Sequence, residues 1–348
     1  MLNIFGMDLA ELNSVLKPYN LPNYRAKQIA EWLYRKSAAS FADMTNLSLA
    51  LRQKLSADFC IARPHIKDRL NSADGKTIKY LLEFADGTAV ETVLMQHPYG
   101  NSVCVSTQAG CAMGCVFCAS TLHGRARNLT AGEILSQVII FNDLLQREQN
   151  AAVDTIVIMG SGEPLENYDN VLKFIRLVHE PYTLNIGYRN ITLSTSGIVP
   201  NMLKLATENI PISLAVSLHA PNNDLRSKIM PINRKYPLSD VVQAAKNYAD
   251  KTGRRITYEY ILIADLNDSG HEAAELASLL RGQLASVNLI PINPVLERNL
   301  LRPSQKRIMA FENYLQSKHI NVTLRREMGT DIQAACGQLR NKHIQKKS

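Results

Sequence analysis

From residue 102 onward, short β-rich runs alternate with helical stretches, and this alternation constrains the fold more than any other feature. The β-rich runs are 102–107, 155–159, 190–194, 212–218, 256–263 and 287–291. Mostly apolar strands separated by helices predict a parallel sheet with helices outside it. Six β/α units are too few to close an eight-stranded barrel. We therefore expect an α/β fold built on an open, partial (βα)6 TIM-like barrel.

Several polar and glycine-containing motifs follow these predicted strands, at the end where such folds carry their chemistry. Gly162 lets the backbone approach a ligand closely, and Glu163 can accept a hydrogen bond from an ammonium group. Taken singly, each motif is an ordinary βα loop, and a lone histidine is usually structural. Their common edge makes them candidates for one ligand site. The other candidates are Ser194, Ser217, Leu218, His219 and Asn293.

The residues before the barrel are predicted to form a separate helical unit. Up to about Asp68 they are predicted to be helical, with apolar positions 26, 29, 30 and 33 on one face and a second helix over 47–59. The basic residues there, such as Arg25 and Lys27, fit a solvated helix surface or an RNA-contacting module equally well. The segments 77–84 and 90–95 flank an Asp-Gly pair and predict a β-hairpin.

The predicted division of the chain has four parts. These are a helical accessory domain (1–76), a hairpin that leads to the core (77–96), the barrel core (97–330) and a C-terminal segment with a basic tail (331–348). In the core, Thr130 and Glu133 form a capping-box pattern before an apolar helical repeat.

Composition narrows the classes of protein that fit. The chain has 348 residues with 46% hydrophobic content and no run of eighteen apolar residues, so we expect no transmembrane helix. The N-terminus lacks the basic start of a signal peptide. Six cysteines, three of them clustered, indicate a reducing compartment and hence the cytoplasm. A net charge of +8 and a pI near 9.1 favour a polyanionic partner.

Cys111, Cys115 and Cys118 form the most specific motif. At spacings of four and three, with glycines beside them, three thiolates can hold three corners of a cubane iron–sulfur cluster and leave one iron open. A ferredoxin would need a fourth cysteine nearby. A structural zinc site would need a second ligand pair, and His123 is the only nearby histidine. Three buried free cysteines are the plainest alternative.

The CxxxCxxC spacing, with an aromatic residue before the last cysteine, resembles that of the radical S-adenosylmethionine (SAM) enzymes. That resemblance implies a [4Fe-4S] cluster whose open iron is chelated by the amino and carboxylate groups of SAM. An electron from the cluster then cleaves SAM to a 5′-deoxyadenosyl radical. In this setting, the loop with Gly162 and Glu163 is expected to hold the SAM amino group.

The chain as a whole resembles the RlmN/Cfr adenosine methyltransferases of this superfamily. The resemblance covers nearly the whole chain, and the Ala-Cys-Gly-Gln-Leu segment at 335–339 is very specific. The matching segments are 22–28, 110–118, 159–164, 193–197, 217–221, 230–238, 288–294 and 335–339.

By this resemblance the substrate is an adenosine in the peptidyl-transferase region of 23S rRNA. RlmN-type members methylate its carbon 2 and also act on the adenosine 3′ to the tRNA anticodon. Cfr-type members methylate carbon 8 and confer antibiotic resistance. Pro164 after Glu163 is RlmN-like, as are segments 288–294 and 302–304 and the pair Arg325 and Arg326, whereas Ser161 stands where many members have Met.

The resemblance also implies catalytic roles. Cys336 would carry a methyl group taken from one SAM, and a radical from a second SAM would activate that group for addition to the base. Cys104 would then form a transient disulfide with Cys336 to release the product, and Glu91 would accept a proton. Without the resemblance, Cys104 would be a core residue and Glu91 an exposed strand residue.

The partners implied are rRNA, tRNA and an electron donor such as flavodoxin or ferredoxin, with no membrane and a monomeric chain. Arg25, Lys27, Arg325, Arg326 and the tail 340–347 are the candidate phosphate contacts. Two other functions stay open: a Cfr-type carbon-8 methyltransferase, and a non-catalytic RNA-binding iron–sulfur protein.

Overall fold

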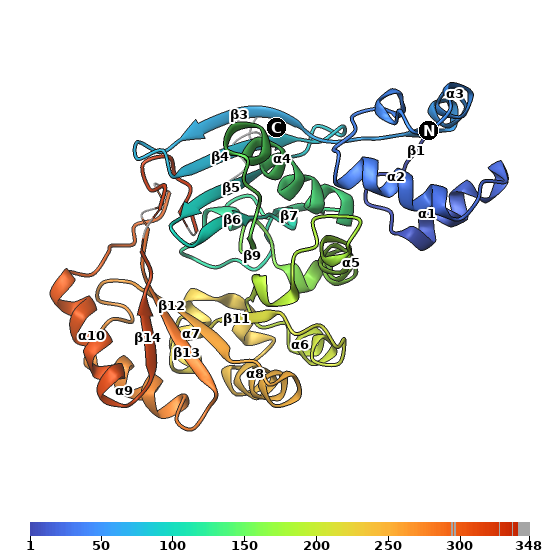
Figure 1. Ribbon diagram of the computed structural model, residues 1–348. Coiled ribbons are helices and arrows are strands. Elements are labelled where there is room, and N and C mark those ends of the chain that lie inside the picture. The colour runs from blue at the N-terminus through green and yellow to red at the C-terminus, as the bar shows by residue number, and fades with distance from the viewer. Residues whose placement is uncertain (294, 296, 327, 336, 340–348) are drawn as a thin grey trace.

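One ten-stranded sheet organises the computed structural model, which describes residues 1–293, 295, 297–326, 328–335 and 337–339 (Figure 1). The strand order is β14-β13-β12-β11-β10-β9-β6-β5-β4-β3. The strands are β3 His65–Asn71, β4 Thr77–Glu83, β5 Ala89–His97, β6 Gly100–Cys104, β9 Thr155–Ile158, β10 Ile191–Thr195, β11 Ser213–Ser217, β12 Ile256–Leu262, β13 Ala285–Pro291 and β14 Asn321–Leu324.

The sheet is mostly parallel and open. Strands β6 and β9–β14 run parallel, whereas β3, β4 and β5 pair antiparallel and extend the sheet beyond β6. Strands β3 and β14 are the two edges, and the strand direction turns steadily between them (Figure 1). The predicted α/β fold with an open sheet is confirmed. All six predicted strands are present, and β14 is a seventh parallel strand that was not predicted.

Helices connect the parallel strands and lie outside the curve of the sheet (Figure 1). They are α4 Ala131–Gln149, α5 Tyr168–His179, α6 Val199–Leu205, α7 Asn223–Ile229, α8 Leu238–Thr252, α9 Gly270–Leu279 and α10 Gln305–Ser317. The predicted capping box begins α4, because Thr130 accepts from the Glu133 amide and Glu133 accepts from the Thr130 amide. Within the described residues, no helix is both long and apolar enough to cross a bilayer.

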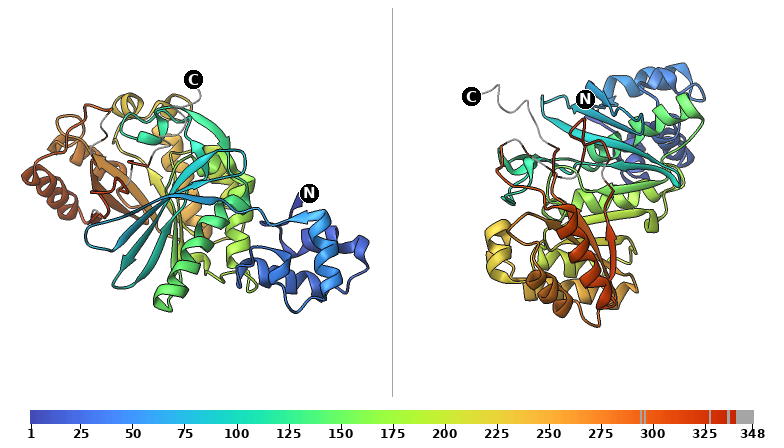
Figure 2. Two further views of the ribbon diagram at one scale, coloured as in Figure 1. Left: turned by 90° about the horizontal axis from the view of Figure 1, so that it is seen from above. Right: turned by 90° about the vertical axis from the view of Figure 1, so that its left-hand side faces the viewer.

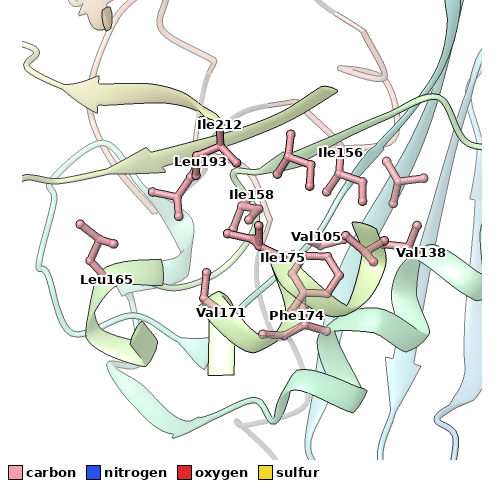
Figure 3. Packing of buried hydrophobic residues seen from close by; sticks show 14 of the residues in the cluster. Val105, Val138, Ile156, Ile158, Leu165, Val171, Phe174, Ile175, Leu193 and Ile212 are labelled. Carbon is pink, nitrogen blue, oxygen red and sulfur yellow. The ribbon is translucent and has the colours of Figure 1, made fainter. Parts of the chain in front are cut away.

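The core lies between the sheet and these helices (Figure 3). Ile156, Ile158 and Leu193 on the strands pack against Phe174 and Ile175 of α5, and all five are almost fully buried. Each such side chain contributes about 1.5–3 kcal/mol through removal of apolar surface from water. This packing fixes the position of the parallel strands, whose carboxyl ends carry the candidate ligand-site residues.

The N-terminal helices form a lobe beside the sheet (Figure 2). The lobe comprises β1 Leu2–Asn3, α1 Leu9–Leu16, α2 Tyr24–Tyr34, α3 Leu49–Asp58 and β2 Phe59–Cys60. Both predicted helices are present. The expectation that residues up to Asp68 are helical was wrong for the last of them, because β3 begins at His65. This strand is polar and exposed at the sheet edge, so it lacks the alternation that marks a half-buried strand.

Two glycines bring this lobe against the barrel. A Cβ atom added to Gly6 would lie 2.5 Å from the Gly132 Cα, and one added to Gly132 would lie 2.6 Å from the Phe5 carbonyl oxygen. The Tyr34 hydroxyl closes the same turn: it accepts from the Gly6 amide at 3.0 Å and donates to the Met7 carbonyl at 2.7 Å. The lobe therefore rests on α4 through backbone-to-backbone contact.

Gly132→Ala should lower the urea midpoint of unfolding, since the new methyl group must displace backbone at a cost of about 1–3 kcal/mol. Helix propensity alone predicts the opposite sign, a gain of about 1 kcal/mol. Gly270→Ala, in the first turn of α9, is the matched control, because nothing lies within 4 Å of its Cβ position. A Gly132→Ala protein as stable as the parent would show that the lobe is not packed tightly on α4.

Candidate active site

The carboxyl ends of the parallel strands meet at one edge of the sheet, and the predicted ligand-site residues stand there. Ser194 is the second-last residue of β10, Ser217 ends β11, and Leu218 and His219 follow β11. Gly162 and Glu163 follow β9, and Asn293, which is buried, follows β13. Residues from four separate strands therefore reach the same edge, as the strand order requires.

The cysteine loop lies at this edge. Cys111 and Cys115 are buried, and Cys118 is partly buried. The loop turns at Gly110 with φ 77° and at Gly114 with φ 72°. A Cβ atom on Gly110 would lie 1.9 Å from the Gly124 carbonyl oxygen, so only glycine fits there. The backbone thus folds the three thiols into one enclosed loop.

Burial raises the pKa of all three thiols. It raises the pKa of Cys111 to about 12, and the neighbouring Cys118 thiol adds to the effect. Burial also raises the pKa of Cys118, and it raises that of Cys115 well above its usual range, with both other thiols contributing. Three neighbouring thiolates, two of them buried and one partly buried, need a strong positive charge among them, which iron supplies. These residues therefore fit a cluster.

A single metal ion is a poorer fit. Among the described residues, no three His, Cys, Asp or Glu side chains gather tightly enough to hold one ion. Thiolates on separate corners of a cubane bind different irons, so they need not converge on one point.

Glu163 is fixed in place by neighbouring donors. Its carboxylate accepts from the Thr195 hydroxyl at 2.7 Å, the Ser196 amide at 2.7 Å and the Leu165 amide at 3.0 Å. Burial raises the pKa of Glu163, and these hydrogen bonds oppose the rise. Gly162 reaches this position with φ 106°, tight against Gln108. Since a carboxylate has about four acceptor positions, room for one further donor remains.

Ser194 and Ser217 belong to a polar group that includes a residue not predicted from the sequence. The Ser194 hydroxyl donates to Glu259 of β12 at 3.2 Å and lies 3.5 Å from the Ser217 hydroxyl. Glu259 is buried and also pairs with Arg325 at 3.5 Å. The contact of Arg325 with RNA phosphate stays a prediction, and the structure adds an ion pair between its partly exposed side chain and Glu259.

His219 is held as a neutral ring. It is buried with φ 60°, its Nδ1 accepts from the Ile261 amide at 3.0 Å, and its ring meets Phe117 edge-on at 4.7 Å. Burial, with the nearby Arg226, lowers the pKa of His219 to about 3. Because Nδ1 is the acceptor, Nε2 carries the proton. The histidine thus links the cysteine loop to β12.

Arg226 of α7 is a buried cation that sequence reasoning missed. Its guanidinium donates to the carbonyls of Leu218, Ser196 and Ser217 at 2.6–3.1 Å and to the Asn233 side chain at 2.9 Å. Burial lowers the pKa of Arg226 to about 10, and the Cys115 thiol opposes this, so the group stays charged at neutral pH. The side chain joins the ends of β10 and β11 behind the cysteine loop.

Cys104 meets the C-terminal segment. Cys104 packs in one small cluster with Val93, Ala334 and Leu339. The cysteine loop contacts the same segment, since the Ala119 amide donates to the Gly337 carbonyl at 2.8 Å and the Ser120 hydroxyl to the Leu339 carbonyl at 2.8 Å. Cys336 itself lies outside the described residues, as do 340–348. The chain on both sides of Cys336 therefore lies between Cys104 and the cysteine loop.

Glu91 is buried on β5 and pairs with Lys79 of β4 at 2.9 Å. It is therefore not the exposed strand residue that its position in the sequence suggests. Lys79 was not predicted, because a lysine on an alternating strand normally faces water.

Two family descriptions match the chain. Residues 105–277 match the "Radical SAM superfamily", and residues 2–61 match the "Ribosomal RNA large subunit methyltransferase N-terminal domain". The first covers the cysteine loop and most of the barrel, and the second covers the N-terminal lobe.

Curated relatives and a solved structure match over the full length. "Probable dual-specificity RNA methyltransferase RlmN" from Symbiobacterium thermophilum is 53% identical over 340 residues, which are 97% of this chain and 91% of that one. The protein of the same name from Desulforamulus reducens is 50% identical over 345 residues, 99% and 97% of the two chains. A radical SAM methyltransferase from Sphaerobacter thermophilus is 46% identical with a TM-score of 0.94, covering 98% and 99%. The chain therefore belongs to the RlmN family of radical SAM RNA methyltransferases.

Proposed function

We propose that this enzyme methylates carbon 2 of an adenosine in the peptidyl-transferase region of 23S rRNA and of the adenosine 3′ to the tRNA anticodon. The relatives' name, dual-specificity RNA methyltransferase, supports two RNA substrates. One structural observation carries the chemistry: Cys104 and the residues on either side of Cys336 lie together beside the cysteine loop. A carrier thiol, a resolving thiol and a cluster must share one site for this reaction.

Cys111, Cys115 and Cys118 would hold the [4Fe-4S] cluster and leave one iron for SAM. With SAM, the cluster supplies an electron and an organic radical. The strand-end residues would bind SAM: Glu163 receives its ammonium group, and Gly162 lets the backbone come close. The remaining contacts are assigned to Ser194, Ser217, Leu218, His219 and Asn293. An electron donor such as flavodoxin or ferredoxin would reduce the cluster.

The protein side chains divide the remaining work. Carbon 2 of adenine is not nucleophilic, so Cys336 would first take a methyl group from SAM by displacement. That carbon, once the radical has taken a hydrogen atom from it, bonds to carbon 2. The adduct must then lose one electron, which the cluster would accept, and the carbon-2 proton, which Glu91 would take. The Cys104 thiolate would then attack the Cys336 sulfur, and the departing carbon would take up a proton to become the methyl group of the released base. This leaves a disulfide, which a thiol reductant must open before the next turnover.

The carbon-8 alternative uses the same side chains, so a product assay must separate the two. The RlmN name of the full-length relatives and Pro164 after Glu163 favour carbon 2. Mass spectrometry of nucleosides from an rRNA fragment treated with reconstituted enzyme distinguishes 2-methyladenosine from 8-methyladenosine. Release of 5′-deoxyadenosine excludes a non-catalytic RNA-binding protein.

Replacing Cys111, Cys115 or Cys118 with Ala should remove the brown absorbance of anaerobically reconstituted protein and abolish SAM cleavage. Each thiolate would bind a different iron, so losing any one opens the cluster to solvent. Cys60→Ala is the control and should keep four irons per chain. A triple Ala variant that still binds four irons would refute the assignment.

Cys104→Ala should trap the enzyme on RNA. The carbon–carbon bond can still form, but without the second thiol the base stays attached through Cys336. Denaturing electrophoresis of protein expressed in cells should show an RNase-sensitive shift that is absent from Cys336→Ala. Near-normal RNA methylation by Cys104→Ala would show that Cys104 is only a core residue. Inactive protein without covalently bound RNA would also contradict its role as the resolving thiol.

RNA affinity should fall steeply with salt, because each phosphate contact releases counterions. Lys27 and Arg326 are exposed, whereas Arg25 bonds to Gln28. Replacing Lys27 or Arg326 with Ala should reduce the log–log salt slope by about 1 each. Lys246→Ala, on the outer helix α8, is the control. A slope unchanged in both test variants would remove these residues from the RNA interface.

A further inference from the structure

One face of strands β4, β5 and β6 carries a row of aligned side chains. Lys79 on β4 lies opposite Val93 on β5, and Val93 lies opposite Cys104 on β6. Glu91 is two residues from Val93 and so points to the same face. The other face of β4 is different, since Ile78, Tyr80 and Leu82 belong to the main core. Lys79 therefore projects toward the site, away from the helix layer.

Lys79 has two partners on that face. Its ammonium lies 2.9 Å from the Glu91 carboxylate and donates to the Gln333 carbonyl at 3.1 Å. Its side chain is only 6% exposed. A lysine is rarely buried this far unless its charge is bonded, and here one bond goes to the proposed proton acceptor and the other to the chain three residues before Cys336.

The rest of segment 329–335 is held along the same strand. The Asp331 carboxylate accepts from the Ala73 amide at 2.8 Å, just before β4. A Cβ atom on Gly329 would lie 2.7 Å from the Thr77 methyl group. Of the residues that hold this segment, Lys79 also contacts a proposed catalytic group, the Glu91 carboxylate.

We propose that Lys79 is a positioning residue that sets the segment carrying Cys336 and the Glu91 carboxylate in register with each other. This rests on the roles proposed for Glu91 and Cys336. The carbon carried by Cys336 and the carboxylate that takes the proton must reach the same base from fixed directions. One ammonium bonded to both elements fixes their separation. A simpler role, in which Lys79 only neutralises buried Glu91, does not require the bond to Gln333.

Four variants of the full-length protein separate these roles: Lys79→Arg, Lys79→Met, Glu91→Gln, and the double variant Lys79→Met with Glu91→Gln. The double variant removes both charges, so no unpaired carboxylate stays buried to disturb folding. Lys67→Met is the matched control, because Lys67 on the neighbouring strand β3 pairs with Glu83 of β4 and is exposed. The rate of amide hydrogen exchange in peptide 329–335 measures how firmly Lys79 holds this segment, and it does not require turnover. The exchange rate in α4 shows whether the fold is intact.

With α4 unchanged, peptide 329–335 should exchange about tenfold faster in Lys79→Met and in the double variant, as expected for loss of one hydrogen bond from a charged donor. Glu91→Gln and Lys67→Met should match the parent, and Lys79→Arg should restore protection. If peptide 329–335 exchanges at the same rate in the double variant and in Glu91→Gln, Lys79 does not hold the segment and the proposal is refuted.

The methylated fraction of Cys336 in protein purified from cells gives a second readout. It should fall several-fold in Lys79→Met and the double variant but stay normal in Glu91→Gln, since Glu91 would act only after this step. Normal Cys336 methylation in the double variant would overturn the positioning role. If parent protein carries no methyl group on Cys336, the proposed function fails, yet the exchange result still decides whether Lys79 holds the segment.

Discussion

Strand β6 is the junction on which the site depends. It pairs in parallel with β9 on one side and antiparallel with β5 on the other. A barrel of parallel strands alone would end at β6, and its last strand would present unpaired backbone groups. Here the sheet continues into β5, β4 and β3, so Cys104 stands between the barrel and the antiparallel strands. The side chains of β5 and β4 thereby lie next to the site formed by the loops at the ends of the barrel strands.

Buried charge is the second organising feature. Glu163, Arg226 and the Lys79–Glu91 pair all lie away from water, where a charge without partners is very costly. Each is bonded to backbone or to an opposite charge from another element. Buried charges of this kind add little net stability. They do require that the strand ends, the cysteine loop and the C-terminal segment adopt one arrangement, because any other leaves a charge unpaired.

Much of the barrel was predictable because each strand is a short apolar run that a helical stretch separates from the next. Strand β14 was missed because its four residues follow a helix without a clear apolar run, and β3 because an exposed edge strand lacks alternation. The cysteine loop was recognisable because its three cysteines lie within one stretch of eight residues. Arg226, Glu259 and Lys79 were not recognisable, because their importance arises from contacts that only the folded chain brings together. The ion pair between Arg325 and Glu259 was not predictable for the same reason, since only the fold brings the two side chains together.

The contacts of the C-terminal segment have a consequence for how the protein is made. Gln333 bonds to a residue 254 positions earlier, and Leu339 to one 219 positions earlier. A chain emerges from the ribosome N-terminal end first, so the cysteine loop is complete long before the segment that packs against it exists. Throughout that interval this side of the loop lacks the residues that cover it in the folded protein. The contacts of Gly337 and Leu339 with the loop can form only after this later segment has been synthesised.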